Sequence, residues 1–147
     1  MKLDIPGKIA ADKEEYQKKR EPYITGKEDS TKVEGWASMQ RVMAKPRMLE
    51  LSYKLRDVAQ AIYATVNDPK MLVQAIEWVK LAEGYFPHFS NEAVYAGLLL
   101  KCGRKQEAAD MMTKASNDIF IKGKDKQKLL LGNVAKIQNG EAPEQLW

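Results

Sequence analysis

Apolar side chains recur every three or four positions along most of this 147-residue chain. That spacing places them on one face of an α-helix, and the run from Leu51 to Val66 keeps it most regularly. Comparable stripes predict helices over residues 29–45, 47–66, 69–86, 90–102, 105–115 and 125–139. No stretch sustains the period of two that a half-buried strand requires. The sequence therefore predicts an all-α fold.

Residues that begin or end helices separate these stripes. Asp68 can cap the N-terminus of a helix whose first position is Pro69, where the missing N–H is no loss. Ser90 and Asp125 are expected to cap two later helices. Gly103 is placed to end a helix in the left-handed conformation. Short turns are therefore expected between the helices.

The first 28 residues differ from the rest of the chain. They are highly charged and are interrupted by Pro6, Pro22 and Gly26. A short helix over residues 8–20 can form, but Ile9 and Tyr16 give it only a thin apolar face. We expect residues 1–28 to be a loosely held arm, residues 29–140 to be the helical domain, and residues 141–147 to be a C-terminal tail.

Four alanines recur at a fixed interval. Ala75 and Ala82 are followed 33 positions later by Ala108 and Ala115. Each pair lies in the second helix of a predicted helix–turn–helix unit. Small side chains allow two helices to approach closely. A period of this length is typical of stacked helical hairpins. The pattern covers residues 55–116, and we expect the helices over residues 29–45 and 125–139 to cap this short stack.

The segment 91–115 resembles a tetratricopeptide repeat (TPR). The matching positions are the small, large and turn residues Ala96, Leu99, Gly103, Ala108, Met112 and Ala115, with Pro87 as the closing proline of the preceding unit. The family's usual Trp and Leu-Gly of the first helix are replaced by Glu92, Tyr95 and Ala96. The resemblance implies TPR-like antiparallel helical hairpins that form a fragment of a right-handed α–α superhelix.

The same resemblance implies a protein- or peptide-binding groove lined by the first helices of successive repeats. The groove positions are Gln60, Ala64, Ala93, Gly97, Leu100 and Lys101. Ala93 and Gly97 replace the lysine and asparagine of the family's carboxylate clamp, so that activity is not implied. A small apolar floor favours packing of a helix or an extended segment. That segment could come from a partner, from a missing domain of the same polypeptide, or from the N-terminal arm.

A narrower resemblance leaves two alternatives open. Residues 64–80 and 95–108 are similar to the helical tail of certain bacterial thioredoxin-like proteins, but no Cys-x-x-Cys precedes them here. One alternative is therefore a detached accessory segment of a thioredoxin-like thiol-disulfide protein, without redox activity of its own. The other is a structural domain that forms a homodimer.

Residues that could carry catalysis or bind a metal are sparse. His88 is the only histidine and is expected to face solvent in a turn, and Cys102, the only cysteine, is expected to be a small buried apolar group. Neither a phosphate-binding glycine cluster nor a nucleophile elbow is present. We expect a protein-binding module that is not an enzyme and needs no cofactor or metal.

The charge balance bears on partners and location. The net charge of +4 arises from 24 Lys and Arg mixed with 20 Asp and Glu, so nucleic-acid binding is not expected. The lysine run over residues 122–128 suits a solvated linker. No apolar stretch is long enough to cross a bilayer. We expect a soluble protein, cytoplasmic if Met1 is the native start and periplasmic if a leader was removed.

Overall fold

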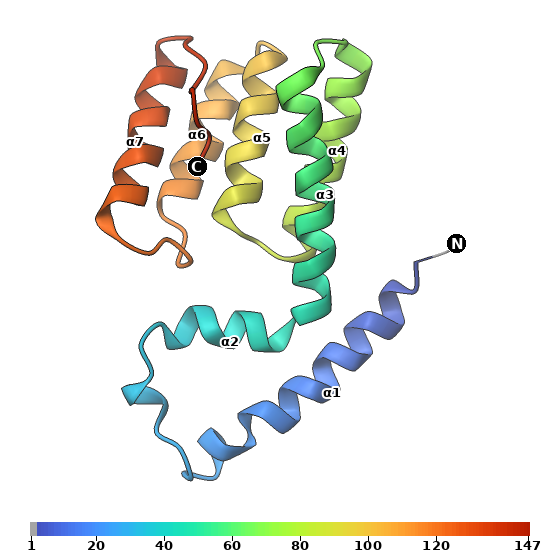
Figure 1. Cartoon of the computed structure of the whole chain (residues 1–147), viewed down its shortest axis with the longest axis vertical. Helices are drawn as coiled ribbons and strands as arrows, with labels where there is room; N and C mark the ends of the chain where they lie inside the picture. Colours follow the sequence, from blue (N-terminus) through green and yellow to red (C-terminus); the bar gives the residue numbers. More distant parts are fainter. Residues whose placement is uncertain (1–2) are drawn as a thin grey trace. The chain divides into compact units, whose positions relative to one another are not determined.

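The computed structural model describes residues 3–147, which contain seven α-helices and no strand (Figure 1). The all-α prediction is confirmed. The helices are α1 (Ile5–Ile24), α2 (Trp36–Ala44), α3 (Pro46–Thr65), α4 (Pro69–Tyr85), α5 (Phe89–Lys101), α6 (Lys105–Ser116) and α7 (Lys124–Gln138). A short 3₁₀ turn, Ser30–Lys32, precedes α2, so the helix expected over residues 29–45 is a turn followed by a shorter helix.

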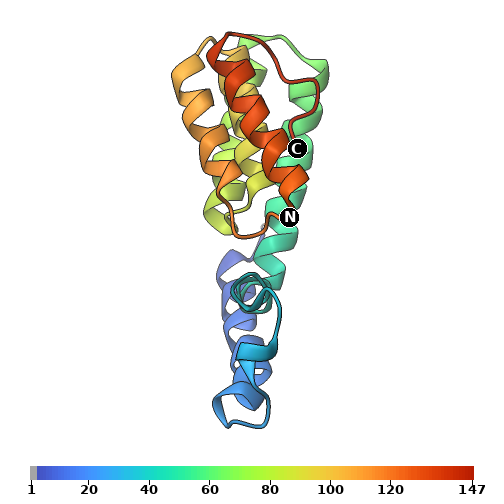
Figure 2. The same ribbon diagram turned by 90° about the vertical axis from the view of Figure 1, so that its left-hand side faces the viewer.

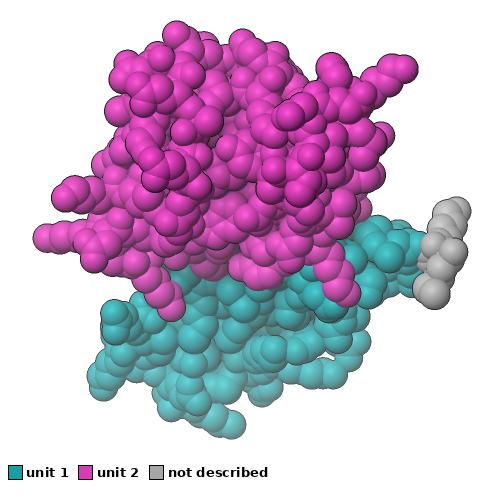
Figure 3. All heavy atoms as spheres, turned by 45° about the horizontal axis from the view of Figure 1, so that its top comes forward, with its two compact units in different colours: residues 1–51 teal, residues 52–147 magenta. Residues whose placement is uncertain are grey.

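The chain divides into two compact units, unit 1 (Met1–Leu51) and unit 2 (Ser52–Trp147), coloured separately in Figure 3. The division therefore falls within α3, whereas the sequence placed it between residues 28 and 29. Residues before and after position 28 belong together because they pack on one another. The rings of Tyr23 and Trp36, for example, lie 4.4 Å apart.

A buried carboxylate organises unit 1. Asp12 is the buried residue of α1, and its oxygens accept hydrogen bonds from the main-chain N–H groups of Arg47 and Met48 at 3.2 and 3.3 Å. The Arg47 guanidinium donates to the same carboxylate at 2.9 Å and to Glu15 at 2.9 Å. The first N–H groups of a helix have no partner inside that helix. Asp12 therefore caps the first turn of α3 from a distant part of the sequence.

Two of the predicted helix boundaries in unit 2 are confirmed. The Asp68 carboxylate accepts a hydrogen bond from the Met71 N–H at 3.0 Å, and Pro69 is the first residue of α4. Gly103 has a φ of +76°, the left-handed conformation expected after α5. Two other predictions are wrong. His88 caps α5 in place of Ser90, and Gly123 precedes α7, whose first residue is Lys124 rather than a residue after Asp125.

Replacing Asp68 by alanine is expected to destabilise unit 2 by about 1 kcal/mol, because the first turn of α4 loses its side-chain acceptor. Urea unfolding measures the change in the free energy of unfolding. Asparagine is an equally good cap, so Asp68→Asn should stay within a few tenths of a kcal/mol of the native chain. Equal losses in both variants would show that the cap contributes nothing.

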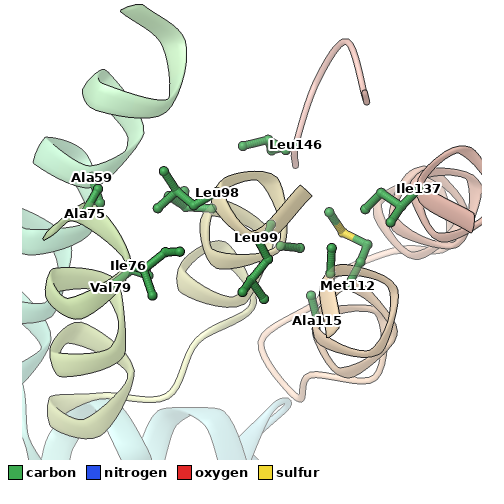
Figure 4. Close-up of a cluster of buried hydrophobic side chains, with 14 of the residues drawn as sticks. Ala59, Ala75, Ile76, Val79, Leu98, Leu99, Met112, Ala115, Ile137 and Leu146 are labelled. Carbon is green, nitrogen blue, oxygen red and sulfur yellow. The ribbon is translucent and has the colours of Figure 1, made fainter. Parts of the chain in front are cut away.

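The helices α3 to α7 run antiparallel in turn (Figure 1). From α4 onward, each of them packs against the next. Figure 2 shows α6 on one side of this unit and α3 on the other. The core lies between the helices, with Leu98 and Leu99 of α5 near its centre (Figure 4). The four recurring alanines are all fully buried: Ala75, Ala82, Ala108 and Ala115. Their predicted position in the helix contacts is therefore confirmed.

Candidate functional site

The six predicted groove residues lie on α3 and α5 and differ in exposure. Ala93 and Gly97 are buried, Gln60 and Leu100 are half-buried, and Ala64 and Lys101 are exposed. All six residues lie within these two helices. The two residues expected to form an open floor are covered, however, so the six together are not an accessible groove.

The cover over Gly97 comes from the end of the chain. The non-helical residues 141–147, here called the 141–147 segment, follow α7 and run across the side of unit 2 on which α3 lies (Figures 1 and 2). Leu146 is 6 % exposed and belongs to the core cluster. Figure 4 shows it above Leu98, between α3 and α7. The C-terminal tail expected over residues 141–147 is therefore a packed part of unit 2.

Three helices hold the 141–147 segment. A Cβ atom at position 97 of α5 would lie 2.8 Å from the ring of Tyr63 on α3 and 3.1 Å from the Leu146 side chain, so glycine is needed for this close approach. From α7, the Asn133 amide donates hydrogen bonds to the main-chain carbonyls of Gln145 and Leu146 at 2.8 and 3.1 Å. We call the surface around Tyr63, Gly97 and Asn133 the α3–α5–α7 face.

Lys101 has a different role from the one predicted. Its ammonium group donates hydrogen bonds to the main-chain carbonyls of Tyr63 and Val66 and to the Asn67 side chain. The last carbonyls of a helix lack partners within that helix, and a positive charge is favourable there. Lys101 therefore closes the C-terminus of α3 instead of offering its charge to a groove ligand.

Arg56 connects the 141–147 segment to the start of α5. Its guanidinium donates to the Ser90 hydroxyl at 2.8 Å and lies over the rings of Tyr53 and Trp147, at 4.3 and 5.6 Å from their centroids. Cation–π contacts of this kind are strongest when the cation is withdrawn from water, as the half-buried Arg56 is. Sequence reasoning missed this residue because its partners come from three separate segments of the chain.

His88 is 9 % exposed, so the prediction that it faces solvent is wrong. Its ring packs against Tyr53, Phe89 and Phe120. Burial lowers the pKa of His88 from 6.5 to about 4; the Arg56 charge acts in the same direction and Glu83 opposes it. The ring is therefore neutral at pH 7. Its Nδ1 accepts the Ser90 main-chain N–H at 3.2 Å, which places the proton on Nε2.

Ser90 and His88 are the residue types that act as nucleophile and general base in some enzymes. The Ser90 hydroxyl lies 2.7 Å from Nδ1 of His88. Ser90 is only 1 % exposed, however, and its oxygen already accepts a hydrogen bond from Arg56. A substrate has no access to a hydroxyl in that position, so the geometry is that of a buried helix cap. Cys102 is half-buried at the C-terminal end of α5, less enclosed than the sequence predicted.

A second buried carboxylate lies two residues after Ser90 in α5. Glu92 is 3 % exposed, and its Oε1 pairs with the Lys114 ammonium at 2.9 Å, while Lys114 also pairs with Glu83 at 2.7 Å. Oε2 of Glu92 has no hydrogen-bond partner. Burial raises the pKa of Glu92 from 4.5 to about 7; Lys114 lowers it, and the nearby Glu83 charge adds to the rise. Sequence reasoning missed this cluster.

In residues 3–147, no group of three or more His, Cys, Asp or Glu side chains is arranged to hold a metal ion. Within the same residues, no helix combines the length and apolar character needed to traverse a lipid bilayer. No protein-family model, curated protein or solved structure matches this chain, so its own contacts are what bear on function.

Proposed function

We propose that unit 2 is a TPR-like interaction module without catalysis of its own, and that its α3–α5–α7 face binds an extended peptide of a partner protein. The observation that carries the proposal is the 141–147 segment, a non-helical stretch of chain lying on this face. A surface that accommodates one extended segment has the shape and the hydrogen-bonding groups to accommodate another.

The contacts on the face suit peptide recognition. Asn133 donates to two consecutive main-chain carbonyls, groups that every peptide presents whatever its sequence. The absent side chain at Gly97 leaves room for one aliphatic side chain against Tyr63. Main-chain hydrogen bonds combined with a single apolar subsite give affinity from the backbone and selectivity from the side chain.

The buried polar residues support a module without catalysis. Ser90 and His88 are enclosed, and each already has a structural hydrogen-bond partner: the Ser90 hydroxyl accepts from Arg56 of α3, and Nδ1 of His88 accepts from the Ser90 N–H. Oε1 of Glu92 pairs with Lys114 within the bundle. Ser90, His88 and Glu92 are therefore enclosed by the helices that carry the face and do not stand open to a substrate.

The proposal is tested by selecting peptides from a random displayed library on the full chain. We expect extended peptides with micromolar affinity and an aliphatic residue. Their binding should be lost in Gly97→Trp, because the new side chain fills the apolar subsite. Asn133→Ala removes only the amide donors and should weaken binding about tenfold, the equivalent of about 1.4 kcal/mol for its two hydrogen bonds.

The matched control is Gly84→Trp. Gly84 lies in α4, and a Cβ atom there would meet nothing within 4 Å. This variant adds the same bulk away from the face and should bind the selected peptides like the native chain. Circular dichroism verifies the fold of each variant. Selected peptides that bind Gly97→Trp unchanged, or a library that yields no binder, would contradict the proposal.

A further inference from the structure

The 141–147 segment contacts its own bundle as a separate peptide would. Positions 143 and 146 are buried, whereas positions 141, 142, 144 and 145 are exposed. Two side chains therefore anchor the segment, and most of the others face solvent. This is the pattern of an extended chain lying on a surface, and it differs from the continuous burial of a core element.

Few of these contacts depend on the sequence of the segment. The hydrogen bonds from Asn133 go to main-chain carbonyls, and the pair between Lys136 and Glu144 spans 3.9 Å with Glu144 93 % exposed. Exposed pairs of this kind contribute little. The contacts that depend on the side chains of the segment are those of Leu146 over Gly97 and of the Trp147 ring near Arg56. These two contacts therefore determine which peptide sequences the face selects.

The segment is attached directly to the helix that binds it. Gly140, with a φ of +80°, ends α7, and the Glu141 N–H returns to the Lys136 carbonyl at 2.9 Å. A short tether of this kind holds a ligand at an effective concentration on the order of millimolar. A free peptide must compete with that local concentration before it can reach Gly97 and Asn133.

We propose that the 141–147 segment is a self-ligand, which occupies the α3–α5–α7 face and is displaced when a partner binds. The inference rests on the proposed function and adds the chemistry of the partner. The partner is an extended peptide with an aliphatic side chain at the place of Leu146, an aromatic side chain next to it for Arg56, and main-chain carbonyls for Asn133. The segment thus lowers the affinity of the face for every free peptide, and a peptide with these features competes with it best.

The test uses a fluorescein-labelled peptide with the sequence Glu-Ala-Pro-Glu-Gln-Leu-Trp and measures its dissociation constant by fluorescence anisotropy. In the full chain carrying Leu146→Asp, the charged side chain cannot stay buried over Gly97, so the segment leaves the face. We expect this variant to bind the peptide at least tenfold more tightly than the native chain. Adding Asn133→Ala to it should reverse most of that gain.

Leu131→Asp is the matched control, since Leu131 is 51 % exposed on α7 and receives the same new charge. It should bind the peptide as weakly as the native chain does. Leu146→Ala, a milder change, should give an intermediate affinity and keeps the test valid if the aspartate variant unfolds. Equal affinity of Leu146→Asp, Leu146→Ala and the native chain would overturn the proposal.

Two further outcomes separate this inference from the function on which it rests. One outcome is that library-selected peptides bind the native and Leu146→Asp chains equally and do not bind Gly97→Trp. That result would support the peptide-binding function and overturn the proposal that the 141–147 segment occupies the face. A native dimer in analytical ultracentrifugation that dissociates in Leu146→Asp would place the segment on a second copy. That result would overturn the intramolecular arrangement.

Discussion

Replacing Glu92 by glutamine is expected to stabilise unit 2 relative to the native chain by an amount that grows with pH between about 4.5 and 7. In the native chain, burial holds the pKa of Glu92 at about 7, above its ordinary value of 4.5. The folded state thus keeps a proton that the unfolded state releases. The contribution of Glu92 to the free energy of unfolding is complete below pH 4.5 and is lost as the pH rises through 7. The difference between the two pKa values corresponds to a loss of about 3 kcal/mol.

His88 gives the opposite dependence over almost the same range. Its pKa is about 4 in the folded chain and 6.5 ordinarily, so the folded state binds its proton less readily. This contribution is present above pH 6.5 and is lost as the pH falls through 4. The native chain therefore gains stability as the pH rises from 4 to 6.5, whereas His88→Asn does not. The free energy of unfolding of His88→Asn, relative to that of the native chain, should fall as the pH rises over this range. Asparagine retains an acceptor for the Ser90 N–H.

The two variants are compared with the native chain by urea unfolding at pH 4.5, 5.5, 6.5 and 7.5. A Trp36→Phe background leaves Trp78 and Trp147, both in unit 2, as the fluorescent reporters. At each pH, the free energy of unfolding of the native chain is subtracted from that of the variant. This subtraction cancels the effect of the other carboxylates, which titrate in both chains. A Glu92→Gln difference that does not change with pH would show that this carboxylate titrates at its ordinary pKa.

Replacing Asp12 by alanine is expected to release α1 from the first turn of α3, with a loss of about 3 kcal/mol from unit 1. The change leaves two main-chain N–H groups and one side of the Arg47 guanidinium without their acceptor. Hydrogen bonds to a charged group contribute about 1.5–3 kcal/mol each, and water replaces part of that loss for the half-exposed Arg47.

Hydrogen exchange of the α1 amides measures this effect, because Asp12 is the buried residue through which α1 is anchored. Glu15→Ala is the control: Glu15 pairs with the same Arg47 guanidinium at 2.9 Å but lies in a more solvated place. Exposed pairs contribute at most about 1 kcal/mol, so α1 should keep its protection in that variant. Similar exchange in Asp12→Ala and Glu15→Ala would contradict the capping role.

The helices could be predicted because their signals are local. The three-four spacing of apolar residues predicted each helix of unit 2, and Asp68 with Pro69 marked the start of α4 correctly. The recurring alanines predicted close helix contacts, and all four are buried. In each case, the residues that determine the structure are neighbours in the sequence.

The remaining features depend on residues that are distant in the sequence. Asp12 stands in a charged run that is typical of a solvated surface, and its partners lie 35 and 36 positions away. His88 follows a proline in a turn, which is typical of an exposed position. Its ring is nevertheless covered by Tyr53, from earlier in the sequence, and by Phe120, from later in it. Only the three-dimensional arrangement brings these groups together.

The candidate site shows the same limit. The sequence predicted Ala93 and Gly97 as the open floor of a groove, but the structure buries both, and no local signal showed what covers them. An extended segment has no helical period, and the apolar residues Pro143, Leu146 and Trp147 were its only signal. The TPR-like assignment, the peptide ligand and the absence of catalysis remain predictions for the experiments above.

The packing of Leu146 and Tyr63 around Gly97 has a consequence for how unit 2 unfolds. In a linear helical array each hairpin contacts only its neighbours, so the end helices can fray one by one. Here the last residues of the chain reach back to α3, the first helix of the stack. Opening of α3 would also loosen the end of the chain, so both ends should lose protection in one cooperative step.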